Sequence, residues 1–386
     1  MQFSELPLST QLQSALSDLT FTKCSPIQAQ SLPHSLRGHD VLGKAQTGTG
    51  KTAAFLIALF EKLLNEAPSD ERYAGEPRAV VLSPTRELAL QIEKDALDLA
   101  KYCEFNIVSL VGGVDYDKQL KKLNSALVDV VIATPGRLLD FCEKGFVYLD
   151  QIEVLVIDEA DRMLDMGFIP QVKRIEGRCP RKQYRQTMMF SATFTNDVLD
   201  LGRRWMIEPV SVEIEPESVA TDRVTQKLYM VAGDEKLMIL KNILAGDDVE
   251  SVMIFANRRD ECRRLYEALR KNGLKVGLLS GDIAQNKRLK TLDEFKSGKL
   301  RFLVATDVAG RGIHIDGVSH VINFTLPEEA EDYVHRIGRT GRAGRSGTSI
   351  SFACEDDAFR LPSIESLLGK PLECEHPPEA LLSELS

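Results

Sequence analysis

The chain has 386 residues, 43% hydrophobic and 27% charged, a composition typical of globular proteins and a length beyond one ordinary core, so we expect two domains. A membrane protein is excluded and a cytoplasmic location expected, because no basic stretch precedes an apolar core at the start and no apolar run approaches the ~20 residues of a spanning helix. The net charge of −9, from 48 basic and 57 acidic residues, on its own argues against a nucleic-acid partner, but whole-chain charge does not report on a local binding cleft.

The first informative stretch is Phe21-Thr-Lys-Cys-Ser-Pro-Ile-Gln28, predicted to be a turn followed by the start of a helix, which runs through Gln30. The Gln28 amide offers one donor and one acceptor to an adenine edge, and Phe3 and Phe21 offer aromatic surface for stacking. Taken alone the pattern is weak, because a Gln near a helix start and two Phe in a core are common.

A phosphate-binding loop is predicted at Ala45-Gln-Thr-Gly-Thr-Gly-Lys-Thr52, between a strand Asp40–Gly43 and a helix Ala53–Asn65. The glycines let backbone N–H groups point at phosphate oxygens, Lys51 supplies a cation, and Thr52 offers a hydroxyl to magnesium. The general pattern begins with Gly where this chain has Ala, but the strand-loop-helix context outweighs that departure and the alternative of a Gly-rich linker. The loop residues expected to bind nucleotide are Gln46, Thr47, Gly48, Thr49, Gly50, Lys51 and Thr52.

Three further loops carry small or phosphate-binding residues directly after predicted strands. Thr85 and Arg86 follow Ala79–Leu82, Gly112 and Gly113 follow Ile107–Val111, and Thr134 to Arg137 follow Asp129–Ile132. Because the carboxyl ends of parallel strands meet at one edge of a sheet, the loops are expected to form one track. Arg86 at a helix start can hold a backbone phosphate, or can equally pair with an acid such as Glu87.

The run Val154-Leu-Val-Ile157 is predicted to be a strand buried on both faces, and it leads into Asp158, Glu159 and Asp161. Acids just past such a strand lie where open α/β sheets bind ligands, so we expect a magnesium nucleotide there. Asp158 or Glu159 can also cap the helix expected from Ala160, but three acids in four residues exceed what a cap needs.

The next buried strand, Gln186–Thr193, ends in the hydroxyls of Ser191 and Thr193. The stretch before it, Lys173–Arg185, holds six basic residues and only Glu176 as an acid, and a solvated basic face is the favoured interpretation. A closing strand at Pro209–Ile214 and a linker over residues 215–222 complete the first half.

A second α/β unit without a phosphate loop follows. Its predicted strands are Thr225–Val231, Ser251–Phe255, Val276–Leu279, Arg301–Ala305, His320–Asn323 and Gly347–Phe352, with helices such as Arg258–Asn272 and Ile283–Ser297 between them. This alternation predicts a mostly parallel sheet. The region after Phe352 is acidic, and the seven scattered cysteines, none in a Cys-x-x-Cys pair, favour buried thiols over disulfides or zinc ligands.

Arginines at positions 336, 339, 342 and 345 recur every third residue, with glycines between them. This spacing is too dense for a buried helix and favours a loop that inserts guanidinium groups against a γ-phosphate across a domain cleft. The alternative is a basic surface loop.

In this order, the motifs resemble those of the DEAD-box ATP-dependent RNA helicases of superfamily two, with a helicase core of the bacterial type. Asp158-Glu-Ala-Asp161 spells the family name, and the other resembling segments are FTKCSPIQ, AQTGTGKT, PTRELA, TPGR, SAT, Ile254–Asn257, Gln285–Arg288, ATDVAGRG and HRIGRTGR. The chain departs at Thr20 and Gly310, where the family commonly has Gly and Ala. It also departs at His314, where an acid is common, which puts the polar network between the domains in doubt and adds a group that titrates near neutrality.

The resemblance implies two tandem RecA-like domains, each a mostly parallel sheet flanked by helices, with the active site in the interdomain cleft. It gives an N-terminal ATP-binding domain at 1–214, a linker at 215–222, a C-terminal helicase domain at 223–375 and an acidic tail at 376–386.

The resemblance also implies a role for each site residue. Phe21 and Gln28 read adenine, Asp307 meets the ribose, and Thr52 and Asp158 hold Mg²⁺ with ATP. Lys51, Glu159, Arg339 and Arg342 act in hydrolysis, Glu159 as the base for water and the two arginines on the transferring phosphoryl group. Asp161, Ser191, Thr193 and His335 couple the domains. RNA is held by Thr85, Arg86, Gly113, Thr134, Arg137, Arg288 and Thr306.

The activity implied is RNA-stimulated hydrolysis of ATP to ADP and phosphate, coupled to local, sequence-independent unwinding of short RNA duplexes. The expected partner is single-stranded or short duplex RNA within a ribosomal or messenger ribonucleoprotein, and the expected state is a monomer away from membranes. An ATP-dependent RNA clamp or remodeller with little unwinding shares every motif. A DNA-translocating helicase and a purely structural nucleotide-binding module are less favoured alternatives.

Overall fold

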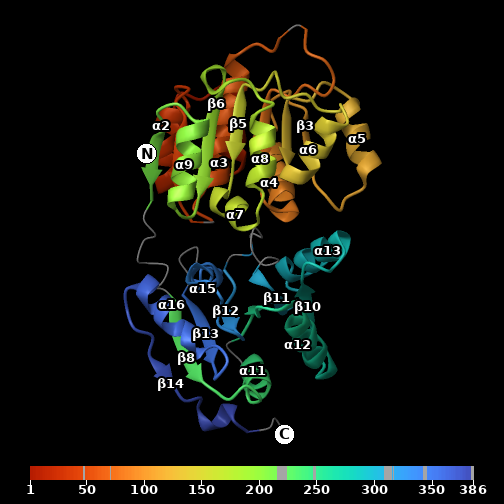
Figure 1. The fold of residues 1–386 in the computed structure, drawn as a ribbon. Coiled ribbons are helices and arrows are strands. Elements are labelled where there is room, and N and C mark those ends of the chain that lie inside the picture. Colours follow the sequence, from red (N-terminus) through yellow and green to blue (C-terminus); the bar gives the residue numbers. More distant parts are fainter. Residues whose placement is uncertain are drawn as a thin grey trace. The chain divides into compact units, whose positions relative to one another are not determined.

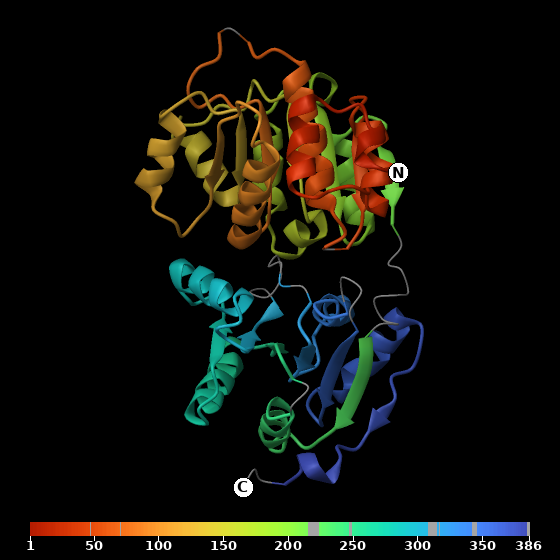
Figure 2. The ribbon, with the colours of Figure 1, turned by 180° about the vertical axis from the view of Figure 1, so that it is seen from behind.

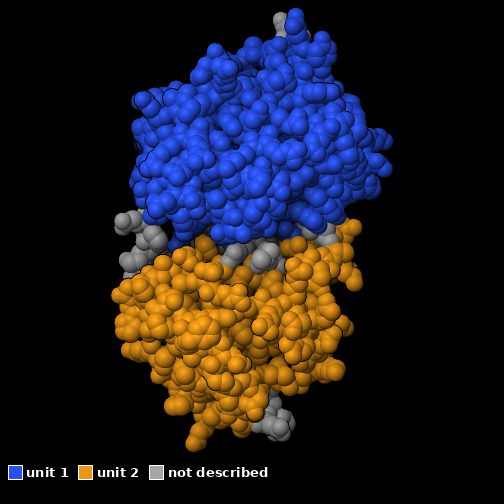
Figure 3. Space-filling view, in the orientation of Figure 1, with its two compact units in different colours: residues 1–216 blue, residues 217–386 orange. Residues whose placement is uncertain are grey.

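The computed structural model describes residues 1–46, 48–69, 71–214, 224–246, 249–307, 315, 317–341 and 346–383. The chain divides into two compact units, Met1–Pro216 and Glu217–Ser386 (Figure 3). Within the described ranges, no helix has both the length and the apolar character that a membrane crossing needs.

The first unit is built on a seven-stranded sheet in the order β3-β4-β2-β5-β6-β1-β7, in which every neighbouring pair is parallel. The strands are β1 (Val41–Lys44), β2 (Ala79–Leu82), β3 (Ile107–Leu110), β4 (Val130–Ala133), β5 (Val154–Ile157), β6 (Gln186–Ser191) and β7 (Val210–Glu213). Because all neighbours are parallel, their carboxyl ends lie at one edge of the sheet (Figure 1).

Helices cover both faces of this sheet, and β5 shows why. Val154 and Val156 pack in one core cluster, while Leu155 and Ile157 pack in another on the opposite face. The first cluster takes residues from α1 (Thr10–Asp18), α2 (Pro26–Ser35), α3 (Lys51–Asn65) and α4 (Arg86–Leu99), the red-to-orange helices in front of the sheet in Figure 2. The second takes residues from α5 (Tyr116–Asn124), α6 (Pro135–Glu143), α7 (Ala160–Asp165), α8 (Ile169–Glu176) and α9 (Asn196–Trp205). Each such buried Val, Leu or Ile contributes about 1.5–3 kcal/mol, so the strand is fixed from both sides.

The second unit repeats the plan with the strand order β10-β11-β9-β12-β13-β8-β14, again parallel throughout. Its strands are β8 (Val224–Met230), β9 (Val252–Phe255), β10 (Val276–Leu279), β11 (Phe302–Ala305), β12 (His320–Asn323), β13 (Gly347–Ala353) and β14 (Cys374–Glu375). The helices are α11 (Lys236–Leu244), α12 (Arg259–Lys271), α13 (Gln285–Lys296), α15 (Ala330–Ile337) and α16 (Leu361–Leu368).

The predicted α/β class with two parallel, helix-flanked sheets is therefore confirmed. Element ends differ by one or two residues: the helix after the phosphate loop begins at Lys51, and β6 ends at Ser191. The prediction of buried thiols holds for Cys24, Cys142, Cys262 and Cys354, whereas Cys374 is exposed on the edge strand β14. The predicted linker at 215–222 lies outside the described residues.

Candidate functional site

The loop between β1 and α3 has a backbone that only glycine tolerates at its last position. Gly50 is the N-cap of α3 and has φ 94°. A Cβ added there would lie 2.5 Å from Gln28 Nε2 and 2.8 Å from Ser25 Oγ. The loop is therefore held closely against the start of α2, and its shape depends on that contact.

Lys51 follows directly, and its ammonium group is buried. The residue is 6% exposed, and its Nζ has no hydrogen-bond partner among the described residues. A buried cation without a partner is costly, whereas an anion at a helix N-terminus is favourable. The site therefore fits a bound phosphate, as the sequence predicts. Thr47, another predicted loop residue, lies outside the described part of the chain.

Gln28 joins the start of α2 to this loop. Its Oε1 accepts a hydrogen bond from Ser25 N at 2.8 Å, and its Nε2 donates to Gly50 O at 3.0 Å. Phe21 is 40% exposed and stacks on the buried Phe3, with the ring centroids 6.1 Å apart. The structure thus brings Gln28 to the phosphate loop through a contact that the sequence did not reveal, whereas Phe21 is placed on Phe3.

The carboxylates after β5 are buried and take different conformations. Asp158 Oδ1 accepts a hydrogen bond from Glu159 N at 3.0 Å. Glu159 has φ 51° and ψ 54°, a left-handed conformation that costs about 1–3 kcal/mol in a residue other than glycine. It is the N-cap of α7, yet its side chain makes no capping hydrogen bond; its Oε2 lies 3.5 Å from Arg162 Nη1. Capping by the Glu159 side chain is therefore excluded.

Asp161 connects α7 to the end of β6. Its Oδ2 accepts hydrogen bonds from Ala192 N at 3.1 Å, Thr193 N at 2.9 Å and Thr193 Oγ1 at 3.1 Å. The Asp161 N–H donates in turn to Ser191 Oγ at 3.2 Å. The strand order places β6 between β5 and β1, so the acids, the hydroxyls and the phosphate loop lie on three adjacent strands.

A second row of predicted residues follows β2, β3 and β4 at the same edge. Arg86 lies against Gly113, where an added Cβ would be only 2.0 Å from Arg86 Nη1, and Gly113 has φ 74°. Thr85 caps α4 by accepting a hydrogen bond from Leu88 N at 3.3 Å. Two of the three predicted loops are therefore in direct contact.

The third loop of the row starts α6. Thr134 is buried at the N-cap of α6, without a capping bond from its side chain. Arg137 lies over the Tyr116 ring, 5.1 Å from its centroid, and its Nη1 has no hydrogen-bond partner in the described structure. The Tyr116 contact, which the sequence reasoning missed, holds the guanidinium near the loop.

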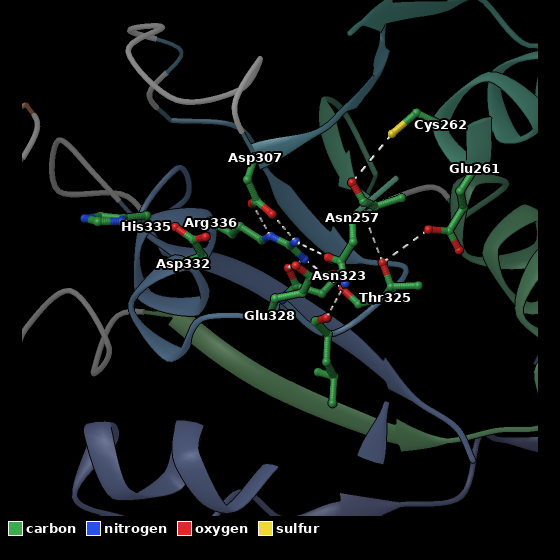
Figure 4. Close-up of polar contacts among 12 residues, drawn as sticks. Asn257, Glu261, Cys262, Asp307, Asn323, Thr325, Glu328, Asp332, His335 and Arg336 are labelled. Atoms are coloured by element: carbon green, nitrogen blue, oxygen red, sulfur yellow. Dashed lines mark hydrogen bonds and ion pairs between the residues drawn. The ribbon is translucent and has the colours of Figure 1, made fainter. Parts of the chain in front are cut away.

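The second unit contains a buried polar cluster centred on Arg336, shown in Figure 4. Its Nε and Nη2 donate to the two oxygens of Asp307, each at 2.6 Å, and Nη2 also donates to Asn257 Oδ1 at 2.7 Å. Nη1 donates to Asn323 Oδ1 at 3.2 Å and to Thr325 O at 2.7 Å. All five N–H donors of the guanidinium are therefore used.

This cluster corrects the interpretation of the arginine repeat. Arg336 lies on helix α15, not in a loop, and is 1% exposed. The helix can bury it because four carbonyl and carboxylate groups from other elements converge on the guanidinium, and sequence spacing does not report such partners. Asp307, predicted to meet a ribose, is held by this arginine.

The remaining predicted residues of the second unit lie close to the same cluster or to its strands. Arg339 is buried just after α15, and its carbonyl accepts a hydrogen bond from Gly317 N at 3.0 Å. Thr306 is buried after β11, Arg288 lies in the first turn of α13, and His335 Nδ1 is 3.7 Å from Asp332 Oδ1. Arg342, Gly310 and His314 lie outside the described residues.

Comparison with known proteins identifies close relatives. The sequence matches the DEAD/DEAH box helicase family over residues 25–201 and the helicase conserved C-terminal domain over residues 235–344. The ATP-dependent RNA helicase RhlB of Pseudomonas aeruginosa is 59% identical over 381 residues, covering 99% of this chain and 96% of that protein. RhlB of Actinobacillus succinogenes is 46% identical over 385 residues, covering 100% and 92%.

Solved structures agree over nearly the whole length. Saccharomyces cerevisiae Dbp5 bound to RNA and ADP BeF3 superposes with a TM-score of 0.84 at 31% identity, covering 98% of this chain and 95% of that one. Mss116p bound to ssRNA and AMP-PNP gives a TM-score of 0.85 at 31% identity, covering 98% and 80%.

Proposed function

The chain belongs to the DEAD-box family of ATP-dependent RNA helicases, and from this membership we infer how its two units divide the binding of ATP and RNA. It is an enzyme that hydrolyses ATP and acts on RNA. The proposed N-terminal ATP-binding domain spans 1–214 and the proposed helicase domain 223–375, with a linker at 215–222 and an acidic tail at 376–386. In this proposal ATP and RNA lie between the domains, at the motif-bearing sheet edges.

The buried Lys51 ammonium is the single observation that carries the proposal, because an anion must compensate it. We assign the β- and γ-phosphates of ATP to Lys51 and the loop Gln46–Thr52. One N–H of the Gln28 amide donates to Gly50 O, and we assign the other to adenine; Phe21, which is 40% exposed, is assigned to stacking. Asp307 is assigned to the ribose.

Hydrolysis is assigned to the acids after β5 together with arginines of the second domain. Thr52 and Asp158 are a hydroxyl and a buried carboxylate, the oxygen ligands that Mg²⁺ accepts beside phosphate. Bound there, Mg²⁺ would neutralise charge on the phosphates. Glu159 accepts the proton of the attacking water, and Arg339 and Arg342 stabilise the negative charge of the transferring group.

Communication between the ligands is assigned to Asp161. Its hydrogen bonds to Thr193 tie the acid-bearing loop to the end of β6. We propose that Ser191, Thr193 and His335 complete this route when the domains close, so that the state of ATP sets the grip on RNA. When ATP and RNA both bind the same closed state more tightly, the binding of each one strengthens the binding of the other.

RNA is assigned to the second row at the sheet edge and to the helicase domain. The proposed contacts are Thr85, Arg86, Gly113, Thr134, Arg137, Arg288 and Thr306, and they address phosphate and sugar rather than bases. We therefore propose sequence-independent local unwinding of short duplexes by a monomer in the cytoplasm, on RNA that belongs to ribosomal or messenger ribonucleoproteins.

RNA-stimulated ATP turnover tests this proposal in the intact chain. The parent protein is expected to hydrolyse ATP faster when single-stranded RNA is added, and Lys51→Gln is expected to lose ATP binding and turnover. Lys101→Gln, which removes an exposed lysine of the same domain, is the matched control and should behave like the parent. An unchanged Lys51→Gln enzyme would overturn the assignment of the phosphate loop.

A further inference from the structure

The exposed surface of the first unit carries a concentration of positive charge that the proposed function does not use. It comprises the end of α8, the connection to β6 and the end of α9, and we call it the basic surface. Its members are Lys173, Arg174, Arg178, Arg181, Lys182, Tyr184, Arg203 and Arg204. Residues 173–185 hold six basic side chains and one acidic one, although the whole chain carries a net charge of −9.

Hydrogen bonds between these segments show that they form one continuous surface. Lys182 Nζ donates to Met206 O at 2.9 Å and to Arg203 O at 3.3 Å, which joins the connection to the end of α9. The buried Arg185 donates to Pro180 O and to Glu176 Oε1, each at 2.6 Å, which folds the connection against the end of α8. Lys182 and Arg185 therefore have structural roles.

Four of the other cations are exposed and unpaired. Arg174 pairs with Glu143, and Arg203 pairs with Asp200 at 2.7 Å. Lys173, Arg178, Arg181 and Arg204 are exposed, and among the described residues none of the four has an acidic group within ion-pair distance. Positive charge is thus available to an external anion.

Helix ends do not account for all of these cations. Lys173 and Arg204 lie in the last turns of α8 and α9, where a cation is favoured by the helix dipole. Arg178 and Arg181 lie beyond the end of α8, in the connection to β6. Tyr184 lies on the short helix Lys182–Tyr184 and is 71% exposed, although an aromatic ring gains nothing from facing water.

The basic surface lies away from the motif edge. The connection enters β6 at Gln186, whereas the phosphate loop, the acids and the hydroxyls all follow the carboxyl ends of β1, β5 and β6. Because these strands are parallel, their amino and carboxyl ends lie at opposite edges of the sheet. An RNA chain that binds at both surfaces must therefore extend beyond the motif edge and pass around the sheet.

We propose that the basic surface binds the phosphate backbone of single-stranded RNA that flanks the segment held at the motif edge. The inference rests on the proposed function, which places RNA on this chain. RNA is favoured over an acidic protein segment because arginines that bind phosphates are here combined with an exposed aromatic ring on which a base can stack.

The proposal predicts how strongly RNA affinity depends on salt concentration. Each phosphate neutralised on a single strand contributes about 0.7 to the slope of log affinity against log salt, so three contacts contribute about 2. The variant Lys173→Gln/Arg178→Gln/Arg181→Gln is therefore expected to lower the slope for an extended RNA by about 2. A fourfold rise in salt concentration should then lower the affinity of the parent for the extended RNA about 20-fold more than that of the variant.

The experiment compares a short single-stranded RNA with the same RNA carrying a single-stranded extension, on full-length protein loaded with a non-hydrolysable ATP analogue. The control variant Arg264→Gln/Arg270→Gln/Lys271→Gln removes the same charge from the exposed face of α12. The parent is expected to bind the extended RNA more tightly than the short RNA. We expect the triple variant of the basic surface to lose this gain in affinity, while its binding of the short RNA and its RNA-stimulated ATP turnover stay at parent values. The control should retain the advantage.

Three results would overturn the inference. The triple variant of the basic surface could show the same salt slope for the extended RNA as the parent, or the control variant could lose as much affinity for the extended RNA. In the third result, the triple variant keeps its RNA affinity but no longer binds polyglutamate. The last would mean that the surface takes an acidic protein segment. Ultraviolet cross-linking of the RNA extension to the peptide that holds Tyr184 provides an independent readout. Loss of RNA-stimulated turnover in the parent would overturn the proposed function instead.

Discussion

At the scale of single residues, Glu159 is held in a constrained position. Its left-handed backbone has an energetic cost, and its carboxylate is buried beside Arg162. Glu159→Gln keeps the size and burial of the side chain but cannot accept a proton. We expect ATP turnover to fall by about 10²–10⁴-fold while ATP binding stays near the parent value. Single-turnover kinetics measure the hydrolysis step, and equilibrium titration measures ATP binding. Turnover of Glu159→Gln at the parent rate would refute the role of Glu159 as the base.

Gly50 provides a second residue-scale prediction, with a matched control in the chain. Gly50→Ala places a methyl group against Gln28, whereas Gly38, at φ 84°, has nothing within 4 Å of an added Cβ. Both substitutions incur the cost of a left-handed alanine, about 1 kcal/mol. Only Gly50→Ala is expected to weaken ATP binding as well, because the phosphate loop must move. Equal ATP affinity in the two variants would show that the Gln28 contact does not shape the site.

Glu261 yields a prediction about pH. Burial, the largest effect, raises the pKa of its carboxyl above the ordinary 4.5, although Lys236 and Arg264 oppose the shift. A carboxyl whose pKa is higher in the folded than in the unfolded state favours folding when it is protonated. Its contribution to the free energy of unfolding is fully present below the unfolded-state pKa and is lost as pH rises through the folded-state pKa. Glu261→Gln is therefore expected to increase the free energy of unfolding at neutral pH relative to the parent, with the difference vanishing below pH 4.5. Urea unfolding at both pH values measures this; a pH-independent difference would contradict it.

At the scale of elements, the buried Arg336 joins α15 by hydrogen bonds to β12 and to the segments that follow β9 and β11. Arg336→Met leaves the Asp307 carboxylate, which is 16% exposed, without its partner, which should destabilise the second unit by up to about 3–5 kcal/mol. The exposed pair of Arg264 and Asp260 is the control, and Arg264→Met should change stability by less than about 1 kcal/mol. Thermal unfolding of the full chain tests the difference, and equal effects would show that the buried cluster adds nothing.

The elements also show what a sequence can and cannot predict. Val154–Ile157 could be assigned as a strand from the sequence, because four apolar residues in a row require burial on both faces. The phosphate-binding loop before Lys51 could be assigned because the spacing of its glycines and lysine is specific. The burial of Arg336 could not be predicted, since its partners Asn257, Asp307 and Asn323 come from distant segments. The bond from Gln28 to Gly50 and the two-residue strand β14 likewise depend on non-local contacts.

At the scale of the whole molecule, the chain belongs to a family of ATP-dependent RNA helicases, and we propose that both of its units contribute residues to the ATP site. In the proposed site, Lys51, Asp158 and Glu159 of the first unit and Arg339 of the second are all buried residues. Under this proposal neither unit alone contains both the base and the arginines that stabilise the transferring phosphoryl group. ATP turnover should therefore depend on RNA, because RNA held by both units favours the closed state.

ATP turnover with and without single-stranded RNA, in the parent and in Arg339→Ala, tests this claim most directly. We expect RNA to accelerate the parent severalfold or more and to have no effect on Arg339→Ala, whose turnover should be at least about 10³-fold slower than that of the RNA-stimulated parent. RNA-independent turnover in the parent that is unchanged by Arg339→Ala would contradict the account.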